Sequence, residues 1–275
     1  LMFGPYQTII LKGVSPMRKT KIVCTIGPAC ETRETLTALC KAGMNVARLN
    51  FSHGIHSEHL ARIENIKTVR EELNLPIAIL LDTKGPEYRI RTFRDGKVVL
   101  QEGQKFTFTT EQIEGDETRV AVNYENLANE MQPGDTILVA NGILVFRVDS
   151  VHGSEIETTV MAGGELSNRK SMSFPGKVLK QTYLSEQDKS DIAFGVANGI
   201  DFIACSFVSC KQDLLDVRNY LAEINAPADI ELIAKIENQS GVDNIEAICE
   251  ACDGIMVARG DMGVEIPFER LPAIQ

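Results

Sequence analysis

The chain has 275 residues, of which 44% are apolar, so it can bury a substantial core and is expected to hold more than one domain. Its formal net charge of -10 argues against nucleic acid or an anionic membrane as a partner. Seven cysteines, an odd number scattered along apolar and helix-like runs, favour reduced thiols in the cytoplasm over a disulfide framework. No apolar run approaches the ~20 residues that a membrane-spanning helix needs.

Residues 1–16 are expected to lie outside the fold, as upstream sequence or as an extension without a structural role. The chain begins with Leu1, whereas Met17 opens a segment typical of a natural start. The short apolar run at 9–11 has the wrong length and the wrong flanks for a signal peptide.

Strand-like and helix-like runs alternate between residues 20 and 84. Polar residues gather where the strands end, because Arg48, Asn50 and Ser52 alternate along the second strand and Asp82–Lys84 follows the third. Apolar strands of this kind belong to a parallel sheet covered on both faces, and α/β enzymes place their sites at the carboxyl ends of such strands. We predict strands at 20–27, 46–51 and 77–81 and helices at 32–42 and 56–73.

The rhythm changes between Pro86 and Lys170, where six short strand-like runs are separated mostly by turn signals such as Asn141-Gly142. This pattern predicts a small all-β domain inserted into the α/β domain. The insertion is either a decoration or, as we favour, a lid, because it leaves directly from the charged strand end at Asp82–Lys84. The predicted strands are 97–100, 105–109, 119–122, 136–139, 144–148 and 155–160.

The α/β pattern resumes after Gly176. Ser185 and Asp188 have the spacing of a helix N-cap box, and Ser209 is expected to cap the next helix. The predicted elements are helices at 185–198, 209–224 and 242–251 and strands at 200–208, 230–238 and 254–265. Six α/β strands without a Gly-x-Gly-x-x-Gly turn or a Gly-Lys-Ser/Thr loop favour a β/α barrel over a doubly wound sheet.

The last two predicted strands turn charged where they end. Lys235 and Glu237 stand two apart, so both point to the same side of a strand, and Arg259 and Asp261 have the same relation. A buried strand does not carry charge without a reason, because an unpaired buried ion is costly. The cluster is therefore either a structural ion pair or a divalent-metal site with a cation aimed at a bound anion.

Two further patterns have the spacing of metal ligands. Cys249 and Cys252 lack a second cysteine pair, so we interpret them as core cysteines of a helix. His53, His56 and His59 suggest zinc, but this spacing is common on helices and no motif with a general-base glutamate accompanies it.

Several motifs resemble pyruvate kinase, and they occur in the family's order from about Met17 to Gln275. The resemblance implies a TIM-type (β/α)8 barrel, incomplete here with about six strands, and a mobile B domain inserted after the third strand. We expect barrel segments at 17–85 and 172–275 and the inserted β-barrel lid at 86–171. The motifs are Lys19–Pro28, Ala47–Gly54, Leu81–Glu87, Ala234–Asn238 and Met256–Pro267.

The resemblance also implies the glycolytic transfer of the phosphoryl group from phosphoenolpyruvate to ADP, giving pyruvate and ATP, with Mg²⁺ or Mn²⁺ and K⁺ as cofactors. By position, Lys235 and Arg48 would be the catalytic residues, Lys235 lying against the transferring phosphoryl group. The backbone of Arg259–Met262, opening a helix, would cradle the substrate carboxylate. The other carried-over roles are substrate contacts at Arg48, Lys235, Arg259, Gly260 and Asp261, nucleotide contacts at Arg89, Lys170, Asn50 and His53, Mg²⁺ ligands at Glu237 and Asp261, and K⁺ ligands at Asn50, Ser52, Asp82 and Thr83.

The chain departs from the family pattern in three places. Ala140-Asn141-Gly142 replaces an Asp-Asp-Gly turn, and Ser173 replaces the commoner Asn, which bears on nucleotide contacts and lid closure. The last two barrel strands and the effector-binding domain do not follow before Gln275, so we expect this chain alone to be unstable and inactive, and the full-length form to be a homotetramer.

Two other functions stay open from the residues alone. Metal-dependent lyases acting on pyruvate or oxaloacetate-type substrates also place acidic metal ligands on adjacent barrel strands. A truncated remnant could hold metal and phosphoenolpyruvate without turnover.

Overall fold

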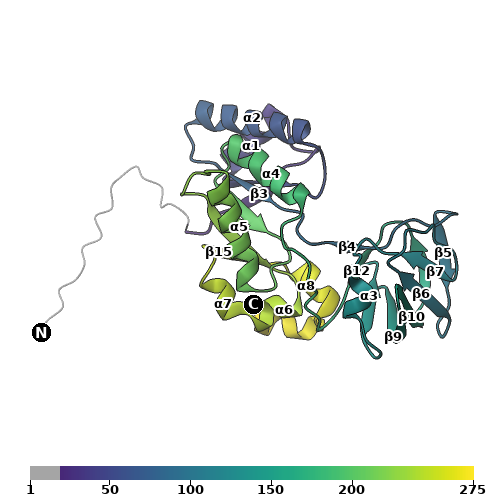
Figure 1. The fold of residues 1–275 in the computed structure, drawn as a ribbon. Coiled ribbons are helices and arrows are strands. Elements are labelled where there is room, and N and C mark those ends of the chain that lie inside the picture. The colour runs from purple at the N-terminus through teal and green to yellow at the C-terminus, as the bar shows by residue number, and fades with distance from the viewer. Residues whose placement is uncertain (1–18) are drawn as a thin grey trace, which may run out of the picture.

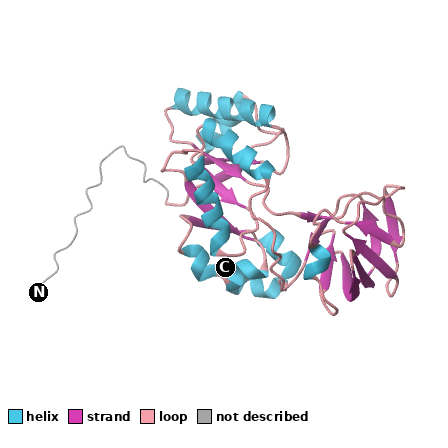
Figure 2. Cartoon of the chain, viewed as in Figure 1, coloured by secondary structure: helices cyan, strands magenta, loops and turns pink. Residues whose placement is uncertain are grey.

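The computed structural model describes residues 19–275, so the expectation for residues 1–16 falls outside the described part of the chain. The chain forms two parts that lie side by side, one of alternating strands and helices and one almost entirely of strands (Figures 1 and 2). None of the described helices is long and apolar enough to cross a membrane.

A six-stranded parallel sheet organises the first part, with the strand order β1-β2-β3-β13-β14-β15. Helices α1, α2, α4 and α5 lie around these strands (Figure 1). The curled parallel sheet is an incomplete TIM-type barrel, which confirms the predicted fold class. Its strands are β1 (Val23–Thr25), β2 (Val46–Asn50), β3 (Ala78–Asp82), β13 (Phe202–Cys205), β14 (Glu231–Ile236) and β15 (Gly254–Val257), and its longer helices are α1 (Arg33–Ala42), α2 (His56–Leu73), α4 (Glu186–Ala197) and α5 (Lys211–Glu223).

Local capping signals explain where the longer helices begin and end. The Thr32 hydroxyl accepts a hydrogen bond from the Thr35 N–H at the start of α1, and Gly43 ends that helix with a φ of 107°. Asn74 ends α2 with a φ of 49°. Ser185 and Asp188 form the reciprocal capping box of α4, as predicted.

Three predicted boundaries in the second half are wrong. Cys210 rather than Ser209 is the N-cap of α5, because the helix begins at Lys211 and Asp213, at its third position, accepts the Cys210 N–H. The single helix predicted at 242–251 breaks at Asn244. The chain leaves the last strand at Val257, so Arg259 and Asp261 lie on a helix and not on one side of a strand. The elements are α6 (Gln239–Asp243), α7 (Ile245–Cys249), α8 (Arg259–Glu265), η1 (Phe268–Arg270) and α9 (Leu271–Ile274).

The second part, called the inserted part below, comprises every element between β3 and α4. It contains a seven-stranded sheet with the order β4-β12-β8-β9-β10-β6-β7 and a two-stranded sheet of β11 and β5. The six predicted strands are present as β5 to β10, whereas β4, β11, β12 and the short helix α3 were not predicted. The bounds are β4 (Tyr88–Arg89), β5 (Lys97–Leu100), β6 (Lys105–Thr109), β7 (Arg119–Ala121), α3 (Leu127–Glu130), β8 (Thr136–Val139), β9 (Leu144–His152), β10 (Glu155–Ala162), β11 (Gly164–Ser167) and β12 (Ser171–Ser173).

Each part has its own hydrophobic core. The buried apolar side chains fall into two separate clusters, one around the parallel sheet and one inside the inserted part. In the second cluster, Phe146 packs edge-on against Phe108 with 4.9 Å between ring centroids. The inserted part therefore does not depend on the parallel sheet for its core.

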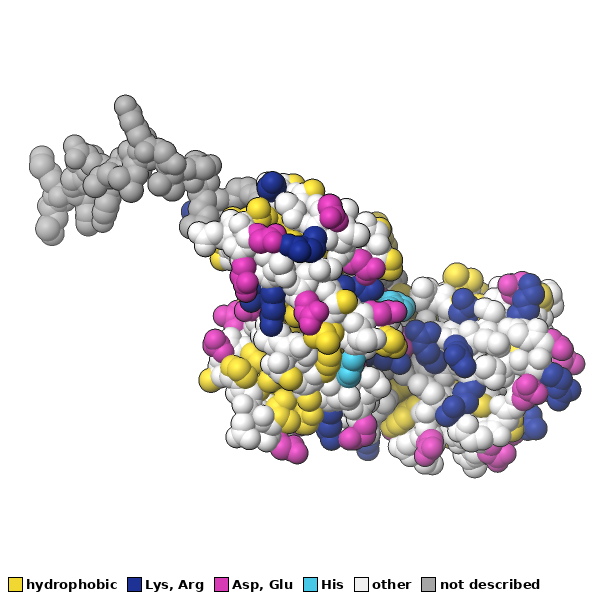
Figure 3. Space-filling view, turned by 90° about the horizontal axis from the view of Figure 1, so that it is seen from above, with side chains coloured by type: hydrophobic (Ala, Val, Ile, Leu, Met, Phe, Trp, Pro, Cys, Tyr) yellow, Lys and Arg dark blue, Asp and Glu magenta, His cyan; other side chains and the backbone are white. Residues whose placement is uncertain are grey.

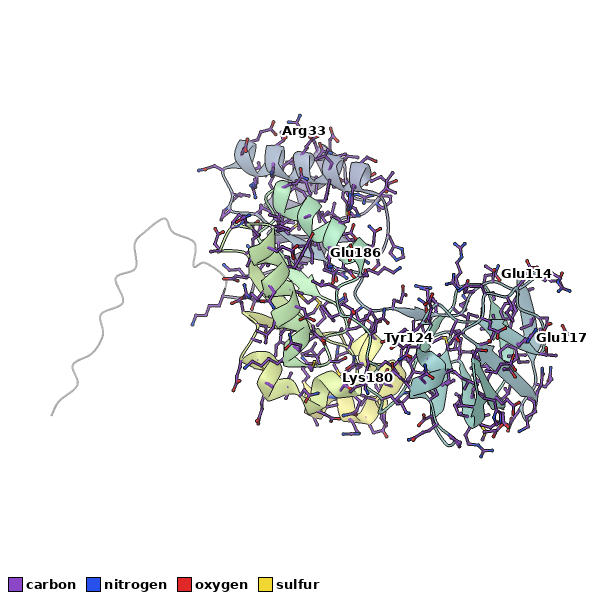
Figure 4. The ribbon with its side chains drawn as sticks, in the orientation of Figure 1. Arg33, Glu114, Glu117, Tyr124, Lys180 and Glu186 are labelled. Atoms are coloured by element: carbon purple, nitrogen blue, oxygen red, sulfur yellow. The ribbon has the colours of Figure 1, made fainter. Side chains whose placement is uncertain are left out.

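The segment between β12 and α4, which leads back to the parallel-sheet part, is bound to the inserted part through Glu130. The Glu130 carboxylate accepts hydrogen bonds from the Tyr124 hydroxyl and from the Lys180 N–H, the latter at 2.8 Å. Tyr124 and Lys180 lie on the two sides of this junction (Figure 4). The Lys177 ammonium adds a hydrogen bond of 2.8 Å to the Glu130 carbonyl oxygen and an ion pair of 2.5 Å with Asp135.

Candidate active site

Buried charges meet at the carboxyl edge of the parallel sheet. Asp82 ends β3, Lys235 lies near the end of β14 and Glu237 directly follows it. Because β13 is the only strand between β3 and β14 in the sheet, the three side chains can reach one another. All three residues are at most 8% exposed. The prediction that polar strand ends share one edge is confirmed for this group.

The charges form a connected series of ion pairs. The Lys235 ammonium lies 2.9 Å from Asp82 Oδ1 and 3.1 Å from Glu237 Oε1. The other Asp82 oxygen accepts the Arg48 Nε–H at 2.5 Å, and the Arg48 Nη1 also donates to the Thr25 hydroxyl at 2.8 Å. Two cations thus neutralise two buried carboxylates, which offsets the desolvation of each ion.

The protonation equilibria of the central pair are shifted by burial and by its partners. Burial alone lowers the pKa of Lys235, but the Glu237 and Asp82 carboxylates outweigh it and hold that pKa above its ordinary value. Burial raises the pKa of Glu237 to about 7, and the charge of Asp261 acts in the same direction against Lys235 and the Phe207 N–H. A second cation beside Glu237 would stabilise its ionised form.

A neutral residue that was not predicted as part of the site joins these charges. The Ser206 hydroxyl accepts from the Lys235 ammonium at 2.7 Å and donates to the Thr83 carbonyl oxygen at 2.6 Å, with Asp82 Oδ1 at 3.1 Å. The following residue, Phe207, has a left-handed φ of 56° and donates its N–H to Glu237 Oε2 at 2.7 Å. Non-glycine residues with positive φ concentrate at functional sites.

A cavity of about 490 Å³ opens beside Glu237 and lies between the two parts. Glu237, Asp261 and Phe207 line it from the parallel-sheet part, whereas Arg89 and Asn141 line it from the inserted part. Figure 3 shows Lys and Arg side chains on the inserted part near this junction. A small ligand in this cavity would contact both parts.

The donor set at the cavity fits a divalent cation of the Mg²⁺ type. Glu237 and Asp261 both line the cavity, and both are carboxylates, the hard oxygen ligands that Mg²⁺ prefers. Residues 19–275 contain no group of three or more His, Cys, Asp or Glu residues placed to hold a metal. Two protein ligands are compatible with Mg²⁺, which keeps several waters and takes substrate oxygens.

The oxygens expected to hold K⁺ are engaged with other groups. Asn50 Oδ1 accepts the Ser52 N–H at 3.0 Å. The Asp82 carboxylate is held by Arg48 and Lys235, and the Thr83 carbonyl oxygen by Ser206. Asn50 and Asp82 are direct neighbours across β2 and β3, so these residues do lie together at one strand edge.

The remaining predicted residues are not all brought to the cavity. Arg89 lines it, where its guanidinium pairs with Glu87 and donates to the Arg169 carbonyl oxygen at 2.6 Å. Four others do not line it and are exposed, namely His53, Lys170, Arg259 and Gly260. The Met262 N–H donates to the Ala258 carbonyl oxygen at 2.9 Å within α8, so it is already used.

The histidines and the cysteine pair make other contacts. His56 Nε2 lies 2.6 Å from Asp191 Oδ1, and His59 Nε2 lies 2.9 Å from the His53 carbonyl oxygen. Cys249 is exposed and Cys252 lies beyond the end of α7, so the prediction of two core helix cysteines is wrong. All seven cysteines are free thiols.

The turn at Ala140-Asn141-Gly142, which departs from the family pattern, adopts the left-handed backbone conformation. Ala140 and Asn141 have φ values of 54° and 57°, followed by Gly142 at 79°. Alanine carries a steric cost in this left-handed region that asparagine and glycine largely avoid. A side chain at Gly142 would lie 3.6 Å from the Val264 carbonyl oxygen, so this turn reaches α8 beside Asp261.

Comparisons with known proteins agree with this geometry. Residues 17–275 match the family model described as pyruvate kinase, barrel domain. Curated pyruvate kinases from Staphylococcus saprophyticus and Clostridium acetobutylicum are 49% and 47% identical over 94% of this chain, and the matches cover 44% and 55% of those proteins. The crystal structure of a pyruvate kinase from Cryptosporidium parvum has a TM-score of 0.89 at 38% identity, covering 94% of this chain and 54% of that chain. The chain therefore spans about half the length of these relatives, and it belongs to the pyruvate kinase family.

Proposed function

We propose that the protein transfers the phosphoryl group of phosphoenolpyruvate to ADP, forming pyruvate and ATP. The observation that carries this proposal is Lys235, a buried cation held between two carboxylates, one of which, Glu237, lines the cavity. Phosphoryl transfer needs little covalent chemistry from the protein and depends on positioned positive charge. Family membership supports the same reaction.

Lys235 and Arg48 are the residues proposed to act on the phosphoryl group. The Lys235 ammonium is fixed by Asp82 and Ser206, so it does not have to reorganise as charge moves between oxygens. Arg48 is anchored by Asp82 and is still 26% exposed, which leaves donors for a phosphate oxygen.

Glu237 and Asp261 are proposed to hold Mg²⁺ or Mn²⁺. When bound, this cation neutralises charge on substrate oxygens. K⁺ is proposed to bind near Asn50, Ser52, Asp82 and Thr83, which requires Asp82 and Thr83 to exchange some of their present hydrogen bonds. The first N–H groups of α8, at Arg259 and Gly260, are proposed to meet the substrate carboxylate.

The inserted part, residues 86–171, is proposed to act as a lid. It stands between the barrel segments 17–85 and 172–275. It already supplies one wall of the cavity through Arg89, which supports a role in gripping the nucleotide. Lys170, Asn50 and His53 are proposed to contact the nucleotide after closure. A cytoplasmic location is consistent with the free thiols, and assembly as a homotetramer stays a prediction from the family resemblance.

The test is Lys235→Met in the full-length product of the gene, assayed for ATP formation from phosphoenolpyruvate and ADP. We expect activity to fall by about 100- to 1,000-fold, the size of effect known for removing a positioned charge stabiliser, while Mn²⁺ binding is largely retained. Lys211→Met is the matched control, because Lys211 pairs with Glu250 on the surface. Retention of activity in Lys235→Met would exclude the role assigned to Lys235.

A further inference from the structure

Tyr183 lies in the connection between β12 and α4, two residues before the N-cap of α4. It is 5% exposed, belongs to the core of the parallel-sheet part and contributes to the cavity wall. Nothing in the sequence marks it as a site residue, since it carries no charge and follows no motif.

The Tyr183 hydroxyl donates to the Ser206 carbonyl oxygen at 2.7 Å, and the bond is buried. This carbonyl belongs to the same peptide unit as the Phe207 N–H, which donates to Glu237 Oε2 at 2.7 Å. The C=O and the N–H of a trans peptide point in opposite directions. Tyr183 and Glu237 therefore hold one peptide plane from its two sides.

The rest of Ser206 is held by groups that already belong to the charged cluster. Its N–H donates to the Thr83 hydroxyl at 3.1 Å, and its own hydroxyl contacts Lys235 and the Thr83 carbonyl oxygen. Within residues 19–275, Tyr183 donates the only hydrogen bond to the Ser206 carbonyl oxygen. The orientation of this peptide thus depends on a residue outside the strand ends.

The peptide also needs such a restraint. Phe207 has a φ of 56°, a conformation that a non-glycine side chain keeps only where the surroundings impose it. The Ser206 carbonyl oxygen is closely packed as well, because a Cβ added to Gly85 would lie 2.6 Å from it. A small rotation of this peptide would turn the Phe207 N–H away from Glu237.

We propose that Tyr183 is a positioning residue, whose hydroxyl fixes the Ser206–Phe207 peptide, aims the Phe207 N–H at Glu237 and thereby sets the affinity of the Glu237–Asp261 pair for a divalent cation. The bonds O–H···O=C and N–H···O⁻ act in series through one amide and strengthen each other. The inference deepens the proposed function and rests on it for its kinetic readout, but its binding readout does not need turnover.

The experiment compares Tyr183→Phe with Tyr220→Phe in the full-length product of the gene. Tyr220 is the matched control, because its hydroxyl also donates to a backbone carbonyl oxygen, that of Lys189 at 3.0 Å, and neither Tyr220 nor Lys189 lines the cavity. Mn²⁺ binding to the substrate-free protein is measured by electron paramagnetic resonance. We expect Tyr183→Phe to weaken Mn²⁺ binding by about 3- to 10-fold, the equivalent of one lost neutral hydrogen bond, and Tyr220→Phe to leave it unchanged.

The kinetic readout separates positioning from a general loss of structure. In Tyr183→Phe the KM for Mg²⁺ should rise by the same factor, while kcat at saturating Mg²⁺ stays within about twofold. A lower melting temperature of Tyr183→Phe with unchanged Mn²⁺ affinity would overturn the inference. An equal loss of Mn²⁺ affinity in Tyr183→Phe and Tyr220→Phe would also overturn it, as would a wild-type protein that binds no Mn²⁺. If Tyr183→Phe does not fold, 3-fluorotyrosine at position 183 should tighten Mn²⁺ binding, since its phenol is the stronger donor, and unchanged binding would overturn the inference.

The two proposals fail in different ways. Weaker Mn²⁺ binding in Tyr183→Phe, in a protein that makes no ATP from phosphoenolpyruvate, supports the positioning role and contradicts the proposed reaction. Full activity with identical Mn²⁺ affinity in the wild type and Tyr183→Phe contradicts the positioning role alone.

Discussion

The carboxyl edge of the parallel sheet and the inserted sheet both carry ion pairs, but they place them differently. At the sheet edge, Lys235 and Asp82 pair with side chains that are 10% and 1% exposed. In the inserted sheet, the pair of Lys105 and Asp149 has a lysine that is 74% exposed. In the described structure, no charged residue of the inserted part is buried, and its core is formed mainly by apolar residues such as Phe146.

The difference indicates which charges are present for function. Exposed pairs cost little to form and stabilise little, so those of the inserted sheet need no special explanation. A buried pair is often no more stabilising than well-packed apolar residues would be. The buried cluster around Lys235 is therefore better explained by what it can bind than by what it adds to stability.

The largest expected contrast comes from removing one lysine in each region. Lys235→Met leaves two buried carboxylates short of a cation and should lower the free energy of unfolding by about 3–5 kcal/mol. Lys105→Met should lower it by no more than about 1 kcal/mol. Urea unfolding of both variants measures the difference. Equal losses would show that burial does not distinguish the two regions.

The stability contributions of one carboxyl group in each region, Glu237 and Asp149, should also change with pH in opposite directions. The pKa of Glu237 is raised from 4.5 to about 7, so the metal-free folded protein binds a proton that the unfolded chain releases. This contribution is present below about pH 4.5 and is lost as the pH rises to about 7, a change of roughly 3 kcal/mol. Hydrogen bonds from Lys105 and Thr159 lower the pKa of Asp149, so its contribution is instead lost as the pH falls below its ordinary pKa.

Unfolding curves in a chelator between pH 4 and 8 measure the Glu237 effect. Glu237→Gln should flatten the dependence in that window, whereas Asp149→Asn should change only the acidic side. The raised pKa of Glu237 would be contradicted if the free energy of unfolding of the wild type rose from pH 5 to 7 and Glu237→Gln showed the same pH dependence.

A smaller contrast comes from two glycines with positive φ. Gly96, in the inserted part, has a φ of 76° and open space where a methyl group would lie, so Gly96→Ala should cost only the left-handed conformation, about 1–2 kcal/mol. Gly85→Ala bears a similar conformational cost and also forces the methyl group against the Ser206 carbonyl oxygen. We expect Gly85→Ala to lose more stability in urea and to weaken Mn²⁺ binding, which Gly96→Ala should not change.

Charge and apolar period predicted the parts of the site that lie on strands. Arg48, Asp82 and Lys235 meet because the carboxyl ends of parallel strands share one edge, which follows from topology alone. Arg259 and Asp261 do not share one side of a strand as predicted, because β15 ends at Val257 and the chain turns into α8. The local signal of this early strand end is Gly260, three residues after Val257, between two charged residues.

Neutral residues were the part that sequence reasoning missed. Ser206 and Tyr183 act through hydrogen bonds to partners that are distant in sequence, and no residue pattern encodes such partners. The strands β4, β11 and β12 were missed for a related reason. They have two to four residues each and are defined by the strands that they pair with rather than by their own composition.

The position of the inserted part has a consequence for how the chain folds. The strands on either side of the inserted part, β3 and β13, pair with each other in the parallel sheet. Beside them, the Ile79 N–H donates to the Asp201 carboxylate, 122 positions away. Contacts of such separation form late and slowly, whereas most strands of the inserted part pair with near neighbours in sequence. An inserted part that folds first would shorten the loop to be closed and reduce its entropic cost. We therefore expect mutations in the inserted core, such as Phe146→Ala, to slow the formation of a sheet that they do not touch.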